Sequence, residues 1–216
     1  QPSSDVVFSI TSGDTGEATV TSALTFTSAN WNTPQTVTVT GADDNIIDGT
    51  ITSTINVAIN DANSNDSFDG VVDQTVSITT TDNDVAGFTI TQSGGSTSVN
   101  ESGTTDTFTV VLNAQPNEEG VTFTAASSDT GEATIAPASL SFTAANWNTP
   151  QTLTVTGVDD NIIDGTQTST TTLSILDAIT DDAFDGVVDQ TVSVTTVDND
   201  VAGFTVVESG GSTSVN

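Results

Sequence analysis

The sequence predicts an all-β protein built from tandem antiparallel β-sandwiches, and three observations predict it. Short stretches such as residues 36–40 alternate apolar residues with Thr, which is the pattern of a strand with one buried face. Clusters of Gly, Pro, Asn and Asp separate these stretches at regular spacing, as in all-β sandwiches. Residues 36–49 also return almost unchanged at 152–165, and such self-similarity indicates a tandem array.

The repeat can be measured from matching residues. Trp31 and Asp48 match Trp147 and Asp164, and the members of each pair lie 116 positions apart. We therefore expect three parts: residues 1–85, a first repeat lacking its N-terminal strands; residues 86–200, a complete second repeat; and residues 201–216, the opening strand of a third. Within it, residues 203–216 are expected either to give a first strand to a neighbouring copy or to have no partner.

The second repeat is expected to contain about seven short strands. In chain order these are residues 88–91, 107–112, 121–124, 140–143, 152–156, 170–176 and 190–197. Their apolar residues should face the core and their Thr and Ser residues the solvent. The first repeat should bury the corresponding positions, which are Phe8, Leu24, Phe26, Val37, Val39, Ile55, Val57, Val76 and Ile78.

The two Trp residues lie at equivalent places, just before a Pro that precedes a strand. Trp31 is followed by Pro34 and Trp147 by Pro150. Each indole is expected to cover the edge of its core, because a single Trp beside a Pro is typically a packing residue. The alternative is a platform on which a sugar ring stacks.

The charge of the chain excludes several functions. The chain has 29 Asp and Glu residues, no Lys, Arg or His, and a formal net charge of −29. It therefore has no side-chain cation with which to bind nucleic-acid phosphates, and an anionic membrane surface would repel it. The absence of Cys and His removes disulfides, thiolate chemistry and the commonest general base. No apolar run is long enough to span a membrane.

Carboxylates that gather in such a chain can be balanced only by backbone N–H groups, hydroxyls, water or metal cations. Antiparallel strand order sends alternate loops to opposite ends of a sandwich. Four acidic groups of the second repeat are therefore expected to meet at its C-terminal pole: Glu101; Asp129; Asp159, Asp160 and Asp164; and Asp198 with Asp200. Calcium takes about six to eight oxygen ligands, which these carboxylates and nearby carbonyls can supply. Scattered acids such as Asp5 are instead expected to be solvated surface residues.

The second repeat carries four motifs in these loops: Val99-Asn100-Glu101, Asp129-Thr130-Gly131-Glu132-Ala133, Val158-Asp159-Asp160 with Asp164, and Val197-Asp198-Asn199-Asp200. Together they resemble the Calx-beta domain, a calcium-binding, immunoglobulin-like β-sandwich. The resemblance implies an immunoglobulin-like fold and bound Ca²⁺. It implies ligand roles for Glu101, Asp129, Asp159, Asp160, Asp164, Asp198 and Asp200, and in the first repeat for Asp14, Asp43, Asp44, Asp48, Asp82 and Asp84.

A second acidic group lies between the last two predicted strands of each repeat, and so at the opposite, N-terminal pole. In the second repeat it includes Asp181, Asp182 and Asp185. We expect calcium to connect these residues with the C-terminal pole of the first repeat, which makes them candidate ligands at a junction between repeats.

These observations favour a structural function. The chain is interpreted as extender repeats of a calcium-stabilised, extracellular protein on a bacterial surface, such as an adhesin stalk or a filament. The sequence around Trp147 also resembles repeats of giant bacterial surface proteins. Expected partners are adjacent repeats and other copies in a filament, with no nucleic acid and no membrane span; a glycan or another surface ligand stays open.

Two other functions are weighed against this one. Rows of Thr-x-Thr and the Trp positions could belong to a carbohydrate- or ice-binding adhesion module, although Thr on any exposed strand face gives the same pattern. An enzyme is not expected, because the adjacent Asp43 and Asp44 of one loop cannot flank a substrate as a glycosidase pair does.

Overall fold

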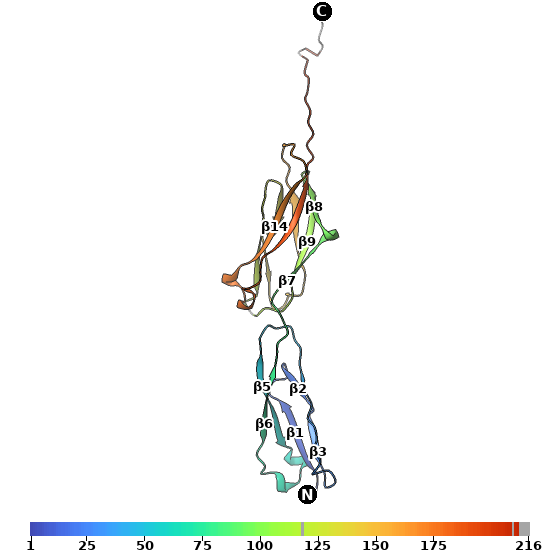
Figure 1. Cartoon of the computed structure of the whole chain (residues 1–216), viewed down its shortest axis with the longest axis vertical. Helices are drawn as coiled ribbons and strands as arrows, with labels where there is room; N and C mark the ends of the chain where they lie inside the picture. Colours follow the sequence, from blue (N-terminus) through green and yellow to red (C-terminus); the bar gives the residue numbers. More distant parts are fainter. Residues whose placement is uncertain (118, 209, 212–216) are drawn as a thin grey trace, which may run out of the picture. The chain divides into compact units, whose positions relative to one another are not determined.

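The computed structural model describes residues 1–117, 119–208 and 210–211, and in this part of the chain all regular structure is β-strand or short 3-10 helix (Figure 1). The chain divides into two compact units, Gln1–Val85 and Ala86–Asn216. Each unit is a β-sandwich, so the predicted fold class is confirmed. None of the helices in the described residues is long and apolar enough to cross a membrane.

The second unit has two sheets. One has the strand order β12 (Ser139–Phe142), β10 (Val121–Ser127), β14 (Gln167–Ile175), β15 (Gln190–Val197) and β8 (Thr97–Asn100). The other has the order β11 (Ala133–Ala136), β13 (Gln151–Gly157), β9 (Thr105–Leu112) and β7 (Phe88–Gln92). Three single-turn 3-10 helices lie between strands, at Ser93–Gly95, Asp177–Ile179 and Asp182–Phe184.

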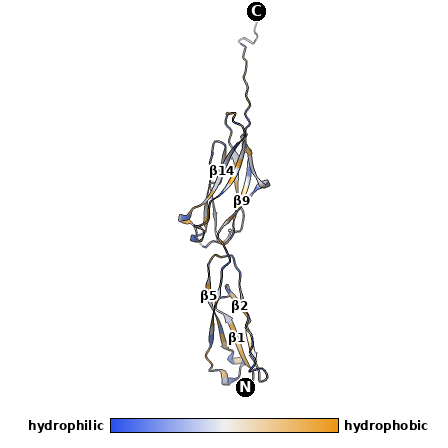
Figure 2. Cartoon of the chain, viewed as in Figure 1, coloured by the Kyte–Doolittle hydropathy of each residue, from blue (hydrophilic) through white to orange (hydrophobic). Residues whose placement is uncertain are grey.

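The core of the second unit lies between these sheets and follows the alternation seen in the sequence. Figure 2 shows apolar residues along strands such as β9. Phe123 packs edge-to-face against Phe88, with ring centroids 4.8 Å apart, and against Phe142 at 5.9 Å. Leu153 on the facing sheet is also fully buried. Burial of such side chains is the main driving force for folding in a chain that has no disulfide.

Two strands of the second unit were not predicted. The strand β11 is short, and β8 contains a single apolar residue, Val99, so neither shows a clear period of two. β8 also pairs in parallel with β15, from Thr97 opposite Val194 to Asn100 opposite Val197. The expectation of wholly antiparallel sheets is therefore wrong at this one pair.

The first unit has fewer strands. Its larger sheet has the order β3 (Ala23–Phe26), β1 (Val6–Ser12), β5 (Ile51–Ile59) and β6 (Gln74–Thr80), and its second sheet pairs β2 (Ala18–Val20) with β4 (Val39–Gly41). Single-turn 3-10 helices occur at Asp61–Asn63 and Asp66–Phe68. The described residues of this unit contain no counterpart of β7, β8 or β9.

This difference explains three wrong predictions, one strand and two buried residues. The strand predicted at residues 36–40 is reduced to Val39–Gly41, because β9, which pairs with the equivalent strand β13 in the second unit, has no counterpart here. Val39 is 42% exposed although its equivalent Val155 is 1% exposed. Val76 was likewise predicted to be buried and is exposed.

Residues 201–208 belong to no strand and are exposed. Residues 209 and 212–216 lie outside the described residues. The prediction that residues 201–216 form the opening strand of a third repeat therefore stays a prediction.

Candidate metal centre

The strand register brings four loops of the second unit to one pole. β8 and β15 run in parallel and end together, β13 ends beside β8 at Gly157, and β14 begins opposite the end of β15. The loops at residues 101–104, 128–132, 158–166 and 198–200 therefore share this C-terminal pole. The loop at residues 176–189 joins the other ends of β14 and β15, so its acids lie at the opposite pole of the same unit.

Glu101 is the centre of the C-terminal pole. It follows β8 directly, and its backbone N–H donates to the carbonyl of Val197, which places it beside the end of β15. Only 1% of Glu101 is exposed. One of its carboxylate oxygens, one from Asp198 and one from Asp200 all lie within 4.8 Å of one another. Three carboxylates thus meet where the second and the last strands of the unit end.

Glu101 also belongs to a second triad, with Glu132 and Asp164, whose carboxylate oxygens again lie within 4.8 Å of one another. Glu132 is buried because it immediately precedes β11, and its carbonyl accepts hydrogen bonds from the N–H of Val158 and the hydroxyl of Thr196. Its Oε2 has no hydrogen-bond partner. A buried carboxylate oxygen without a donor is costly unless a cation is bound to it.

Crowded negative charge and burial raise the pKa values of two carboxylates at this pole, Glu132 and Asp200. Burial, followed by the negative charge of Asp164, raises the pKa of the Glu132 carboxyl above its usual value. Burial, followed by the charge of Asp198, does the same to the pKa of Asp200, whose Oδ2 is buried and also has no hydrogen-bond partner. Both groups are therefore costly to ionise unless positive charge is supplied.

Two further carboxylates of the triads, Glu101 and Asp198, have pKa values shifted in opposite directions. The hydrogen bond from the N–H of Asn199 lowers the pKa of Glu101, but burial and the charge of Asp198 outweigh it, and the net shift is upward. Asp198 accepts hydrogen bonds from the N–H groups of Asp200 (2.6 Å) and Gly165 (2.8 Å), and these lower its pKa. For Asp198, the stabilisation of the ionised form by backbone N–H groups outweighs the effect of burial.

The sequence-derived ligand set is brought together in part. Glu101, Asp164, Asp198 and Asp200 lie in the two triads, whereas the remaining three predicted ligands, Asp129, Asp159 and Asp160, do not. Asp129 accepts from the N–H of Gly131 at 2.9 Å, Asp160 from Ile162 at 2.6 Å and Asp159 from the side chain of Asn199 at 3.0 Å. These three carboxylates order the loops around the triads, each through one oxygen, and their roles as ligands stay predictions.

Sequence reasoning missed Glu132 and its equivalent in the first unit, Glu17. Both lie in the motif Asp-Thr-Gly-Glu-Ala-Thr, in which the Asp was chosen as the ligand. The available signal was position: the Glu directly precedes a buried Ala that begins a strand, Ala133 or Ala18. A carboxylate next to a buried strand end points to a site more strongly than one in the middle of a loop.

The first unit holds a smaller version of the centre. Carboxylate oxygens of Glu17, Asp44 and Asp48 lie within 4.8 Å of one another, and burial followed by the charge of Asp48 raises the pKa of Glu17. A cavity of about 20 Å³ at this place is lined by all three and by Asp82 and Asp84. Of the predicted ligands of this unit, Asp14 and Asp43 lie outside this group.

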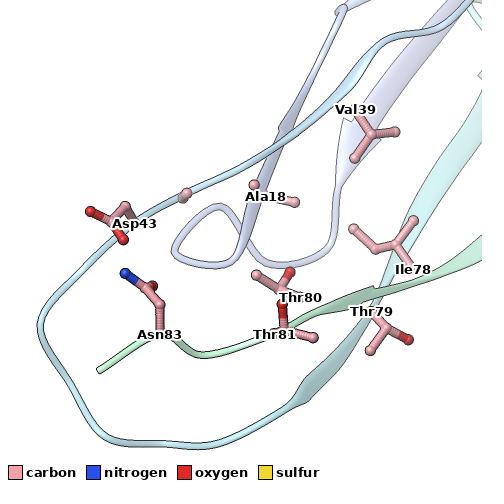
Figure 3. A pocket seen from close by; sticks show the side chains of 10 residues that line it. Ala18, Val39, Asp43, Ile78, Thr79, Thr80, Thr81 and Asn83 are labelled. Carbon is pink, nitrogen blue, oxygen red and sulfur yellow. The ribbon is translucent and has the colours of Figure 1, made fainter. Parts of the chain in front are cut away.

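A groove takes the place of β8 and Glu101 in the first unit. It has a volume of about 580 Å³, and Figure 3 shows Ala18, Val39, Ile78 and Thr80 around it, with Asp43 and Asn83 at one end. Among the described residues, the first unit has no carboxylate equivalent to Glu101. Asp82 and Asp84 therefore line the site without being joined to it in a triad, unlike Asp198 and Asp200.

The candidate junction residues lie at the opposite pole of the second unit. Asp181 is buried and uses both of its oxygens, which accept from the N–H groups of Asn117 (2.7 Å) and Ala183 (3.0 Å). Its equivalent in the first unit is the neutral Asn65, which caps the same 3-10 turn. The roles of Asp181, Asp182 and Asp185 at a calcium-bridged junction stay a prediction.

The residues at the C-terminal pole fit a hard divalent cation. The two triads supply oxygen ligands only, in a place where two buried carboxylate oxygens have no donor. Glu101 belongs to both triads and therefore links them. The second unit has the fuller ligand set, and the first unit has a reduced one.

No protein-family model matches the chain, and no curated protein matches it. Solved structures with a similar arrangement include domains 4 and 5 of the S-layer protein SbsC, at 20% identity over 88% of this chain and 70% of that one, with a TM-score of 0.43. The apo form of the Calx CBD1 domain matches at 16% identity over 52% of this chain and 98% of that one, with a TM-score of 0.38. An endo-fucoidan hydrolase, MfFcnA4, matches at 14% identity over 90% of this chain and 24% of that one, with a TM-score of 0.29. These identities and TM-scores are too low to carry an argument about function.

Proposed function

We propose that the chain is a pair of calcium-binding β-sandwich repeats that serve as structural extenders in an extracellular protein of a bacterial surface, such as an adhesin stalk or a filament. One observation carries this proposal. Glu101, Glu132, Asp164, Asp198 and Asp200 share one pole of the second unit, partly buried, in a chain that has no Lys, Arg or His to balance them.

Calcium suits this site better than the other common metals. Zinc and copper sites in proteins draw on His and Cys ligands, and this chain has neither. Magnesium requires a nearly octahedral shell and usually keeps several waters. Five carboxylates on four different loops form a flexible set of oxygens, which matches the larger and more variable shell of calcium.

A bound ion would serve a structural purpose. Each triad joins loops from different strands, so an ion between them fixes the whole pole and removes the mutual repulsion of its carboxylates. A net charge of −29 otherwise favours expansion of the chain. A repeat ordered in this way keeps a fixed length between its two neighbours, which is what an extender has to do.

Isothermal titration calorimetry with Ca²⁺ and thermal melting with and without a chelator test the proposal together. We expect calcium to bind to the chelator-treated chain and to raise its melting temperature, with a weaker response to Mg²⁺. The variant Glu101→Gln should lose most of the binding by the second unit, because it removes a charge from both triads. Glu119→Gln, the same substitution at an exposed position of that unit, should bind as the unaltered chain does. A melting temperature that is the same in calcium and in chelator would contradict the proposal.

A further inference from the structure

Each unit of the chain contains two Asp-Gly bonds, and the two units carry them at equivalent places. The bonds are Asp48-Gly49 and Asp69-Gly70 in the first unit, and Asp164-Gly165 and Asp185-Gly186 in the second. The residues on either side are also the same at equivalent bonds, with Ile before and Thr after the first bond of each unit, and Phe before and Val after the second. The chain therefore presents the same pair of bonds twice.

An Asp-Gly bond rearranges without an enzyme when its geometry allows, because Gly has no Cβ to hinder attack by its own backbone nitrogen. That nitrogen attacks the protonated side-chain carboxyl group of the preceding Asp. A C–N bond forms, the C–OH bond breaks, and the hydroxyl leaves with the N–H proton as water. A water molecule then opens the resulting five-membered imide, and opening at the original peptide carbonyl gives isoaspartate, whose main chain is one methylene longer. The reaction requires a Gly nitrogen that is free to turn toward the Asp side chain.

The structure holds the Gly nitrogen in place at one bond of each unit. In the second unit, the N–H of Gly165 donates to Oδ2 of Asp198 at 2.8 Å. In the first unit, the N–H of Gly49 donates to Oδ2 of Asp82 at 2.9 Å. Each nitrogen is therefore directed at a carboxylate other than the one it would have to attack, and the negative charge of that carboxylate opposes loss of the N–H proton.

The other bond of each unit is not held in this way. Asp69 and Gly70 are both exposed, and so are Asp185 and Gly186. Among residues 1–117, 119–208 and 210–211, the backbone N–H groups of Gly70 and Gly186 have no hydrogen-bond acceptor. These two nitrogens are free to make the approach that the reaction needs.

We propose that the Asp69-Gly70 and Asp185-Gly186 bonds are sites of spontaneous isoaspartate formation in the folded protein, and that Asp82 and Asp198 protect the other two Asp-Gly bonds from the same reaction. The protected bonds include Asp48 and Asp164, which belong to the carboxylate triads, so a longer main chain there would displace a triad member. The unprotected bonds lie in the loops that join the opposite ends of the same strands.

Rearrangement at Asp185 would alter the turn that carries Phe184. The N–H of Val187 donates to the carbonyl of Phe184 at 3.0 Å, across the Asp185-Gly186 bond, and Phe184 is fully buried. A main chain with an added methylene between these two residues cannot keep that hydrogen bond unchanged. We expect molecules with isoaspartate at this position to have a lower melting temperature of the second unit.

Peptide mapping of the folded 216-residue chain, kept at neutral pH in the presence of a chelator, tests the proposal. Electron-transfer fragmentation of chymotryptic peptides distinguishes isoaspartate from aspartate at each bond. We expect isoaspartate to form at least about tenfold faster at Asp69 and Asp185 than at Asp48 and Asp164, a factor that matches one hydrogen bond to a charged acceptor. In urea, where the hydrogen bonds are lost, the four rates should become similar. Four similar rates in the folded chain, or faster reaction at Asp48 and Asp164, would overturn the proposal.

Asp198→Ala and Asp82→Ala serve as controls for each other. Asp198→Ala should accelerate isoaspartate formation at Asp164 and leave the rate at Asp48 unchanged, and Asp82→Ala should do the reverse. Asp198→Asn keeps an acceptor oxygen and should preserve the protection. Acceleration at both bonds by one substitution, or at neither, would show that these hydrogen bonds do not protect them. Circular dichroism shows whether each variant is folded, and if one is not, the comparison of the unaltered chain with and without urea decides.

Discussion

The α-carbon of Gly157 lies directly against the backbone of Asn100. A Cβ atom built on Gly157 would be 2.2 Å from the carbonyl oxygen of Asn100, and the N–H of Gly157 donates to the carbonyl of Thr104 at 3.0 Å. This approach lets the end of β8 lie against the end of β13. It thereby holds Glu101, the next residue, within the cluster of carboxylates at the C-terminal pole.

Gly157→Ala should therefore disturb the second unit and its metal centre together. We expect its free energy of unfolding to fall by about 1–3 kcal/mol, because backbone has to move to admit the methyl group. The measurement is urea unfolding followed by the fluorescence of Trp147 in a Trp31→Phe background, together with a calcium titration.

Gly41→Ala is the matched control, since Gly41 is the equivalent residue of the first unit. A Cβ on Gly41 would have its nearest neighbour, a methyl carbon of Thr80, at 4.0 Å. We expect a change within about 0.5 kcal/mol. Equal effects of the two substitutions would show that close packing of β8 against Gly157 does not position the metal centre.

Glu132→Gln should have opposite effects in the presence and absence of calcium. Without calcium, the substitution removes a buried charge whose pKa is raised by burial and by Asp164, so the melting temperature should rise. With saturating calcium, a ligand is lost, and the melting temperature should fall below that of the unaltered chain. Glu119→Gln should shift neither value, and a fall under both conditions would indicate that Glu132 has only a packing role.

The stability of the calcium-free chain should increase as the pH is lowered from 7 toward 4. The folded-state pKa values of Glu101, Glu132 and Asp200 are raised, so these groups contribute stability below their unfolded values near 4 and lose it as the pH rises through the folded values. The pKa of Asp198 is lowered, so this group contributes stability above its usual pKa of 3.8. That contribution is lost only as the pH falls below 3.8.

Calcium should reverse this pH dependence, because the ion binds ionised carboxylates and competes with protons for them. Melting temperatures measured between pH 4 and 7 with calcium and with chelator provide the check, the two series being closest at the acidic end. Parallel curves under the two conditions would contradict a carboxylate-bound ion.

Asp181→Ala should destabilise the second unit without changing calcium binding at the C-terminal pole. The substitution removes the acceptors for the N–H groups of Asn117 and Ala183, and we expect a loss of about 1–3 kcal/mol in the free energy of unfolding. Asp181→Asn should lose less, since Asn65 caps the same turn in the first unit. Urea unfolding and calorimetry measure the two quantities separately, and a lower calcium affinity at the C-terminal pole would contradict this assignment.

The sequence was sufficient to predict the sandwich fold, because apolar residues such as Phe123 and Leu153 alternate with Thr on strands that bury one face. It was not sufficient for β8, whose residues are mostly polar and whose parallel partner β15 lies almost a hundred residues away in the sequence. Such a pairing depends on tertiary contacts rather than on local pattern.

The carboxylate cluster at the C-terminal pole was likewise predictable only in part. Asp198 and Asp200 follow a clear strand, so their place at the pole could be inferred from strand direction. Strand direction alone does not separate Glu132 from Asp129, because both lie in one loop; the distinguishing signal was the position of Glu132 directly before the buried Ala133. Asp160 was an equally reasonable ligand in the sequence, but one of its oxygens accepts from its own loop.

The Glu101 carboxylate accepts a hydrogen bond from the backbone of Asn199, 98 residues further along the chain. An ion bound by both Glu101 and Asp198 would close a loop of nearly the whole second unit through its coordination bonds, whereas a disulfide closes such a loop covalently in proteins that have cysteine. The loop-closure entropy removed from the unfolded chain by such a link grows with the length of the ring. In a repeat without cysteine, the calcium concentration would then determine whether this link forms.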